Sequence, residues 1–115
     1  MQNLVENIQI TSVKPNSSFI SSELARRKAN GYLTANVSLF IKADEPMLIP
    51  GMPVRWRMTT FLRLRGYGRV ATVGFIDIDA GTGEVFPLSD PQIAEMKGRA
   101  EAAAASLEFS AAATS

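Results

Sequence analysis

Two neighbouring carboxylates have the residue type and spacing that could support chemistry. Asp77 and Asp79 alternate with isoleucines, so a β-strand would place both carboxylates on the same side. Such a pair can act as a general acid and base, or it can bind a hard cation such as Ca²⁺. The segment IDIDAGTGEV has part of the spacing of a calcium loop. The twelfth position counted from Asp77 is Leu88, however, and not the bidentate glutamate that such a loop needs, so we predict no metal site.

Other catalytic groups are scarce. The chain contains no histidine and no cysteine, which excludes a histidine-based triad, a thiolate nucleophile, a typical zinc site and a disulfide framework. The Gly66/Gly68 and Gly81/Gly83 pairs each lead into a predicted strand and not into a helix, so neither has the geometry of a phosphate-binding loop. We therefore expect a protein that is not an enzyme and that requires no cofactor.

An arginine-rich segment offers a different chemistry. Residues 55–69, RWRMTTFLRLRGYGR, combine five arginines with aromatic residues and contain no acid. Aromatic side chains that stack on bases and arginines that contact phosphates are typical of surfaces that bind single-stranded nucleic acid. Arg63, Arg65, Arg69 and Tyr67 are the candidate residues at the tip of this segment. The alternative interpretation is that they are the solvated charges of an ordinary strand.

The elements that position these groups form a predicted hairpin. Residues 54–64 alternate between apolar and polar side chains, residues 66–68 suit a three-residue loop, and residues 69–79 form the returning strand. If Arg65 lies opposite Arg69, the register brings arginines opposite acids and apolar residues opposite one another. The predicted partners are Arg55 and Asp79, Arg57 and Asp77, Trp56 and Ile78, Met58 and Ile76, and Leu64 and Val70.

Further elements surround this hairpin. The apolar patterns predict a first strand over residues 4–13, a helix over 22–43, a short edge strand over 84–88 and a second helix from Asp90 to about residue 108. The element order β-α-β-β-β-α predicts the α+β class, with a three- to four-stranded antiparallel meander and two packed helices. The apolar stripe of the second helix contains Ile93, Met96, Ala100, Ala103, Ala104 and Leu107.

The side of the hairpin that faces away from the predicted core is not simply polar. In the predicted register it brings together Phe61, Val73 and Phe75, with Phe86 adjacent. A cluster of this kind should be covered, either by the second helix or by a partner subunit. We therefore expect these four residues to form the interface of a homo-oligomer or of a complex with another protein.

Length and composition set outer limits. The chain has 115 residues, a mass of 12.5 kDa and a net charge of +1, which is ordinary for one globular domain. We expect a single domain over residues 1–110 and a frayed tail over 111–115. No apolar stretch approaches the ~20 residues of a membrane span, and the opening residues MQNLVENIQI do not have the pattern of a secretory signal. The expectation is a cytoplasmic protein without membrane contact.

Residues 79–85, Asp-Ala-Gly-Thr-Gly-Glu-Val, end a strand and begin a turn. This segment, preceded by a helix and antiparallel strands, resembles the end of PepSY-type domains. The resemblance implies a small non-catalytic module with an inhibitory or protein-binding role. The chain departs from that family in its second helix and in lacking a visible signal peptide, and no functional residue is carried over.

The favoured prediction is a non-catalytic interaction or regulatory module, of which an antitoxin-like or inhibitor-like subunit is one form. The alternative is a nucleic-acid-binding protein that uses the arginine-rich tip.

Overall fold

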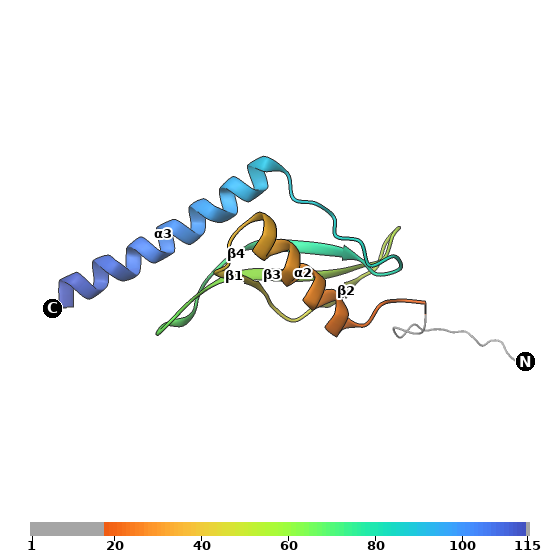
Figure 1. The fold of residues 1–115 in the computed structure, drawn as a ribbon, viewed down its shortest axis with the longest axis horizontal. Coiled ribbons are helices and arrows are strands. Elements are labelled where there is room, and N and C mark those ends of the chain that lie inside the picture. The colour runs from red at the N-terminus through yellow and green to blue at the C-terminus, as the bar shows by residue number, and fades with distance from the viewer. Residues whose placement is uncertain (1–17, 115) are drawn as a thin grey trace, which may run out of the picture.

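The computed structural model describes residues 18–114, with side chains through residue 108, and it has the α+β fold predicted from the sequence. Two helices accompany a four-stranded antiparallel sheet in this part of the chain. The elements are α2 (Ser22–Asn36), β1 (Ile41–Ala43), β2 (Met47–Ile49), β3 (Arg55–Leu64), β4 (Gly68–Asp79) and α3 (Asp90–Thr114) (Figure 1). The strand predicted over residues 4–13 lies outside the described residues.

Strand β3 is the centre of the sheet. Strand β4 pairs along one of its edges, and β1 and β2 pair one after the other along the other edge. All of these pairings are antiparallel, so β1 and β2 together act as one interrupted edge strand. The interruption falls at Pro46, which has no backbone N–H to donate to a ladder.

The predicted hairpin register is confirmed over the first six residues of β3. From Arg55 to Thr60, each residue lies opposite the partner that the sequence predicts. Beyond Thr60 the prediction is wrong, because the register shifts twice and Leu64 lies opposite Gly68 instead of Val70. Each shift leaves one additional residue on β4, as in a β-bulge. An alternating pattern does not reveal such an insertion, because both strands still read as alternating on either side of it.

Helix α2 is shorter than predicted. It begins after Ser21, whose side chain accepts a hydrogen bond from the Leu24 N–H at 3.1 Å, and it ends at Asn36. The prediction of a helix to residue 43 is wrong, because residues 41–43 form β1 and pair with β3. Phe40 and Ile41 fall at helical spacing from Leu33 and Val37 by coincidence. Tertiary pairing, and not local propensity, decides their conformation.

The core lies between the helices and one face of the sheet. Helix α2 contributes Ala25, Ala29 and Leu33, and the sheet contributes a larger set of buried residues, which are Ile41, Ala43, Trp56, Met58, Leu62, Val73, Ile76 and Ile78. The indole N–H of Trp56 donates to the Ile20 carbonyl at 3.0 Å, so this polar group is satisfied.

Helix α3 packs across β4, and its C-terminal half extends past the sheet (Figure 1). The predicted apolar stripe is the side of α3 that is shielded from water, with Met96 buried in the core cluster. Gly74 on β4 leaves room for this contact, because a Cβ there would lie 2.9 Å from the terminal carbon of Met96. The helix continues past residue 108 to Thr114.

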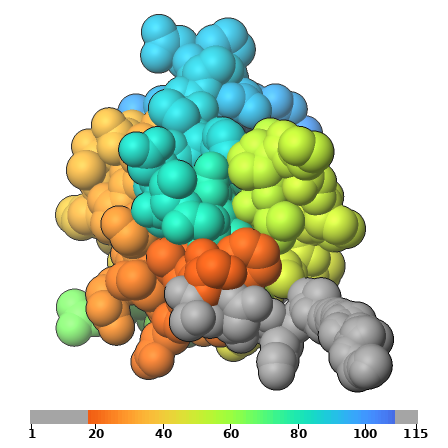
Figure 2. All heavy atoms as spheres, turned by 90° about the vertical axis from the view of Figure 1, so that its right-hand side faces the viewer, coloured from red at the N-terminus to blue at the C-terminus, as the bar shows by residue number. Residues whose placement is uncertain are grey.

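The segment between β4 and α3 does not form the predicted strand over residues 84–88. A single bridge between Ile78 and Val85 is its only strand-like pairing. The segment is held instead by scattered contacts, such as the hydrogen bond from the Leu88 N–H to the Tyr32 hydroxyl at 3.0 Å. When the right-hand side of Figure 1 faces the viewer, this segment lies between α2 and the residues that lead into β3 (Figure 2).

Met58 offers a test of this packing. Because its side chain is fully buried, we expect Met58→Ala to lower the free energy of unfolding by about 2–5 kcal/mol in chemical denaturation. The same substitution at Met52, which is almost fully exposed, is the matched control and should change it by less than about 0.5 kcal/mol. Equal losses in the two variants would contradict this placement of the core.

Candidate interaction surfaces

A buried carboxylate organises the face of the sheet opposite α2. The side chain of Asp77 is 7% exposed and binds two arginines of β3. Arg57 donates from Nε to Oδ1 at 2.8 Å and from Nη2 to Oδ2 at 2.9 Å, and Arg55 donates from Nη1 to Oδ2 at 3.1 Å. The predicted pair of Arg57 with Asp77 is therefore confirmed, with the two-pronged geometry that makes such pairs strong.

The predicted ion pair between Arg55 and Asp79 is wrong. The two residues lie opposite each other in the ladder, but the Arg55 side chain turns to Asp77 instead. Asp79 Oδ1 accepts hydrogen bonds from the N–H groups of Gly81 at 2.8 Å and Thr82 at 3.0 Å, so its carboxylate holds the turn after β4. Asp77 and Asp79 thus have separate structural roles and do not act together.

The environment of Asp77 sets its ionisation. Burial raises the pKa of this carboxyl, but the hydrogen bonds from Arg57 and Arg55 outweigh burial and hold the pKa below its usual range. Asp77 is therefore ionised at neutral pH. Because its pKa is lowered, it is poorly suited to accept a proton as a general base. Over residues 18–114 no three acidic side chains gather in a way that could hold a metal ion.

The arginines also cover the aromatic rings that the sequence places on this face. The guanidinium carbon of Arg55 lies 4.1 Å from the centroid of the Phe86 ring, and that of Arg57 lies 4.4 Å from the Phe75 ring. Arg69 lies in the same way over Phe61, at 4.3 Å. These stacked pairs are cation–π contacts, in which each guanidinium covers part of a ring.

The four residues predicted to form a partner interface are therefore not equally available. Phe61 and Val73 are buried in the chain, Phe86 is half-buried and Phe75 is 40% exposed. Val73 belongs to the core cluster because it is the additional residue of the first register shift, which turns it from its predicted side. Of the four, Phe75 alone offers a large exposed surface.

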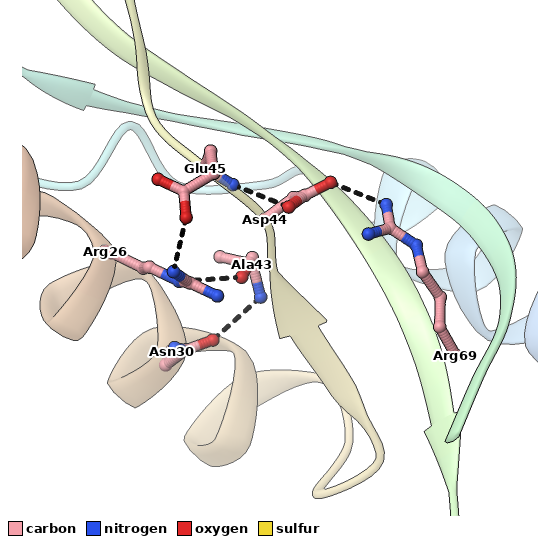
Figure 3. A network of polar contacts seen from close by, with 6 residues as sticks. All are labelled: Arg26, Asn30, Ala43, Asp44, Glu45 and Arg69. Atoms are coloured by element: carbon pink, nitrogen blue, oxygen red, sulfur yellow. Dashed lines mark hydrogen bonds and ion pairs between the residues drawn. The ribbon is translucent and has the colours of Figure 1, made fainter. Parts of the chain in front are cut away.

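A second network ties α2 to the edge of the sheet and restrains Arg69 (Figure 3). Arg69 Nη2 lies 2.6 Å from Asp44 Oδ2, and Asp44 also accepts from the Glu45 N–H at 2.8 Å. The hydrogen bond from Arg69, followed by that from Glu45, lowers the pKa of Asp44. Arg26 donates to the Ala43 carbonyl at 3.2 Å and binds Glu45. Arg69 is thus already neutralised within the fold.

The remaining candidates for nucleic-acid binding lie at the hairpin turn. Arg63 and Arg65 are exposed and have no acidic partner within the described part of the chain, and Tyr67 is 56% exposed. Gly66 and Gly68, with φ of 85° and 71°, form the turn, and these left-handed conformations favour glycine. We call Arg63, Arg65 and Tyr67 the hairpin tip. The structure separates Arg69 from it.

An apolar groove that the sequence did not indicate lies next to the hairpin tip. It has a volume of about 470 Å³ and is bounded by α3, the α2–β1 connection and the ends of β1 and β3. Leu39 and Phe40 in the connection are 64% and 55% exposed. We call this the α3 groove, and its lining residues include Val37, Phe40, Leu64, Ala100 and Ala104, with Lys97 and Glu101.

The α3 groove was missed because the sequence pattern placed Phe40 and Ile41 on the buried face of a helix. A correct prediction that α2 ends at Asn36 would have revealed the groove. Asn30-Gly31 indicates a weak helix, but no residue marks Asn36 as the end.

Comparison with known proteins gives no assignment. No protein family, curated protein or solved structure matches the chain. Among the described residues, neither helix has the length and apolar character needed to cross a membrane. The arguments for function therefore rest on the surfaces described above.

Asp77→Asn tests the role of the buried carboxylate. The substitution keeps the size of the side chain but removes its charge, so we expect the free energy of unfolding at pH 7 to fall by about 1–3 kcal/mol. A carboxyl whose pKa is depressed by folding stabilises the fold above its unfolded pKa of about 3.9, and this contribution is lost as the pH falls through the folded value. The difference between wild type and variant should therefore shrink in acid.

Glu84→Gln is a control for this experiment, because Glu84 is exposed and its carboxylate has no ion-pair partner in the described chain. Its effect should stay within about 0.5 kcal/mol at both pH values. A stability difference for Asp77→Asn that does not change between pH 7 and acid would contradict the role assigned to the charge.

Proposed function

We propose that this chain is a non-catalytic protein-interaction module that assembles with a second copy of itself through the α3 groove. The observation that carries the proposal is the exposure of Leu39 and Phe40 beside a groove whose walls are largely apolar. Apolar side chains that gather at one exposed place are typical of interaction sites. Alanines on the α3 wall allow another helix to approach closely, because interaxial distances depend on the side chains at the contact.

The charges on the wall of the groove favour a second copy as the occupant. Lys97 and Glu101 lie about one helical turn apart on α3, and neither has an ion-pair partner among the described residues. On the same helix, Glu95 and Arg99 do form a pair, at 2.7 Å. The acid precedes the base in that pair, which is the favourable order within a helix, whereas Lys97 precedes Glu101.

In a dimer with a two-fold axis, Lys97 and Glu101 of the two protomers can pair with each other. In a two-fold interface, a contact from one residue to another is repeated in reverse. Lys97 of each protomer would then lie near Glu101 of the other, and both unpaired charges would gain a partner together. The groove is thus complementary to itself in charge as well as in its apolar character.

The absence of a catalytic role is part of the same proposal. The carboxylate of Asp77 is occupied by two arginines, and that of Asp79 is occupied by backbone N–H groups. Neither is available as an acid or base near the α3 groove. The resemblance of residues 79–85 to PepSY-type domains, whose implied role is binding, agrees with this proposal.

Absolute mass in solution is the direct test. Light scattering on a sizing column should give twice the 12.5 kDa chain mass at high protein concentration. Phe40→Asp should shift the protein to monomer, since a carboxylate would be placed in an apolar contact. Met52→Asp introduces the same charge at an exposed position outside the groove and should leave the dimer unchanged.

Charge exchange tests the geometry more sharply. Lys97→Glu creates a surface with two acids, and Glu101→Lys creates one with two bases, so each variant alone should dimerise less well than wild type. A mixture of the two variants should form heterodimers, and the double variant with both changes should form homodimers again. A wild-type monomer at all concentrations, or loss of assembly in Phe75→Asp but not in Phe40→Asp, would overturn the proposal.

A further inference from the structure

The arginines of the hairpin tip differ from the other arginines of the sheet. Arg55, Arg57 and Arg69 each bind a carboxylate and stack on a phenylalanine. Arg63 and Arg65 are exposed and have no acidic partner within residues 18–108. The nearest acids along the sequence are distant, because residues 46–76 contain no Asp or Glu. This part of the sheet therefore carries positive charge that no acid of the described residues neutralises.

The position of Arg63 is unfavourable for folding alone. Its Cα partner across the ladder is Arg69, and like charges directly opposite each other destabilise a sheet. The pair of Arg69 with Asp44 draws one of the two guanidinium groups aside, which leaves Arg63 to face solvent. Lys42 lies opposite Phe61, two positions from Arg63 on the same side of β3, and adds a third cation. Arg63 and Lys42 are thus like charges on one side of the sheet, which is unfavourable for folding.

An exposed aromatic ring accompanies these cations. Tyr67 lies at the centre of the turn between Gly66 and Gly68, and its N–H donates to the Leu64 carbonyl at 3.0 Å. The turn therefore presents an exposed ring at the end of the two-stranded hairpin, two residues after Arg65 in the sequence. A base can stack on such a ring when it is not paired within a duplex, while nearby arginines contact phosphates.

We propose that the hairpin tip is a binding site for single-stranded nucleic acid, in which Arg63 and Arg65 contact phosphates and Tyr67 stacks on a base. This site is separate from the α3 groove and does not depend on self-association. The chain as a whole has a net charge of only +1, so any such binding must come from local charge and not from the charge of the whole protein.

Fluorescence anisotropy with a labelled oligothymidylate of about 16 nucleotides tests the site on the full chain. Two phosphate contacts to a single strand predict a slope of about −1.4 in a plot of log affinity against log salt. The affinity should then fall about sevenfold between about 50 mM and about 200 mM salt. Tyr67→Ser should weaken binding by at least about fivefold, which corresponds to the lower end of stacking contributions.

A matched pair of double variants isolates the tip from net charge. Arg63→Glu with Arg65→Glu should reduce affinity by at least about tenfold at low salt, because two phosphate contacts become repulsive. Arg27→Glu with Lys28→Glu changes the net charge of the chain equally. These residues are exposed on α2, and Lys28 lies beside Gly83 at the opposite end of β4, so this control should change affinity by less than about twofold.

Several outcomes would overturn the inference. The first is no binding of oligothymidylate at low salt, and the second is an equal loss of affinity in the two double variants. Tighter binding to a duplex of the same length would contradict the stacking role of Tyr67. Association with anionic vesicles but not with oligothymidylate would assign the tip to a membrane surface instead. Because the light-scattering test uses other residues, failure of this proposal leaves self-association untouched, and the reverse also holds.

Discussion

The hydrogen-bonded carboxylate of Asp77 is the interaction on which the sheet depends. Strand β3 alternates buried apolar residues with arginines, so a core on one face requires Arg55 and Arg57 to gather on the other. One carboxylate from β4 accepts hydrogen bonds from both guanidinium groups and holds them over Phe86 and Phe75. The carboxylate offsets one of the two positive charges, and each guanidinium covers part of a ring. Phe75 nevertheless remains 40% exposed on this face.

Arg69 likewise binds a carboxylate and stacks on a phenylalanine, and its ion pair links separate elements. Asp44 follows β1 directly, and its bond to Arg69 reaches across the sheet from β1 to β4, over the ring of Phe61. Its neighbour Glu45 binds Arg26 of α2, so the helix and the sheet edge share one network. An ion pair on an exposed surface contributes little by itself, but a connected network restrains the elements that it joins.

The sequence predicted the parts of this fold that follow from alternation and helical periodicity. The α+β class, the hairpin, the ladder from Arg55 to Thr60 and the buried stripe of α3 are confirmed. The end of α2 and the register beyond Thr60 were not predictable, since tertiary pairing and additional bulge residues leave no trace in a periodic pattern. The α3 groove was missed for the same reason. Residues 37, 38, 40 and 41, which line part of the groove, fall in the range where α2 was expected to continue.

The two halves of β3 differ in the residues that they carry. Its first half has a regular register, two arginines bound to Asp77, and the buried side chains of Trp56 and Met58. The second half contains both register shifts, an arginine opposite an arginine, and one wall of the α3 groove. Bulges often re-aim side chains near functional sites. In the register of the first half, Arg63 would lie opposite Ala71 and Arg65 would lie opposite Arg69. The two shifts instead place Arg63 opposite Arg69 and leave Arg65 in the turn, beside the exposed ring of Tyr67 in the sequence.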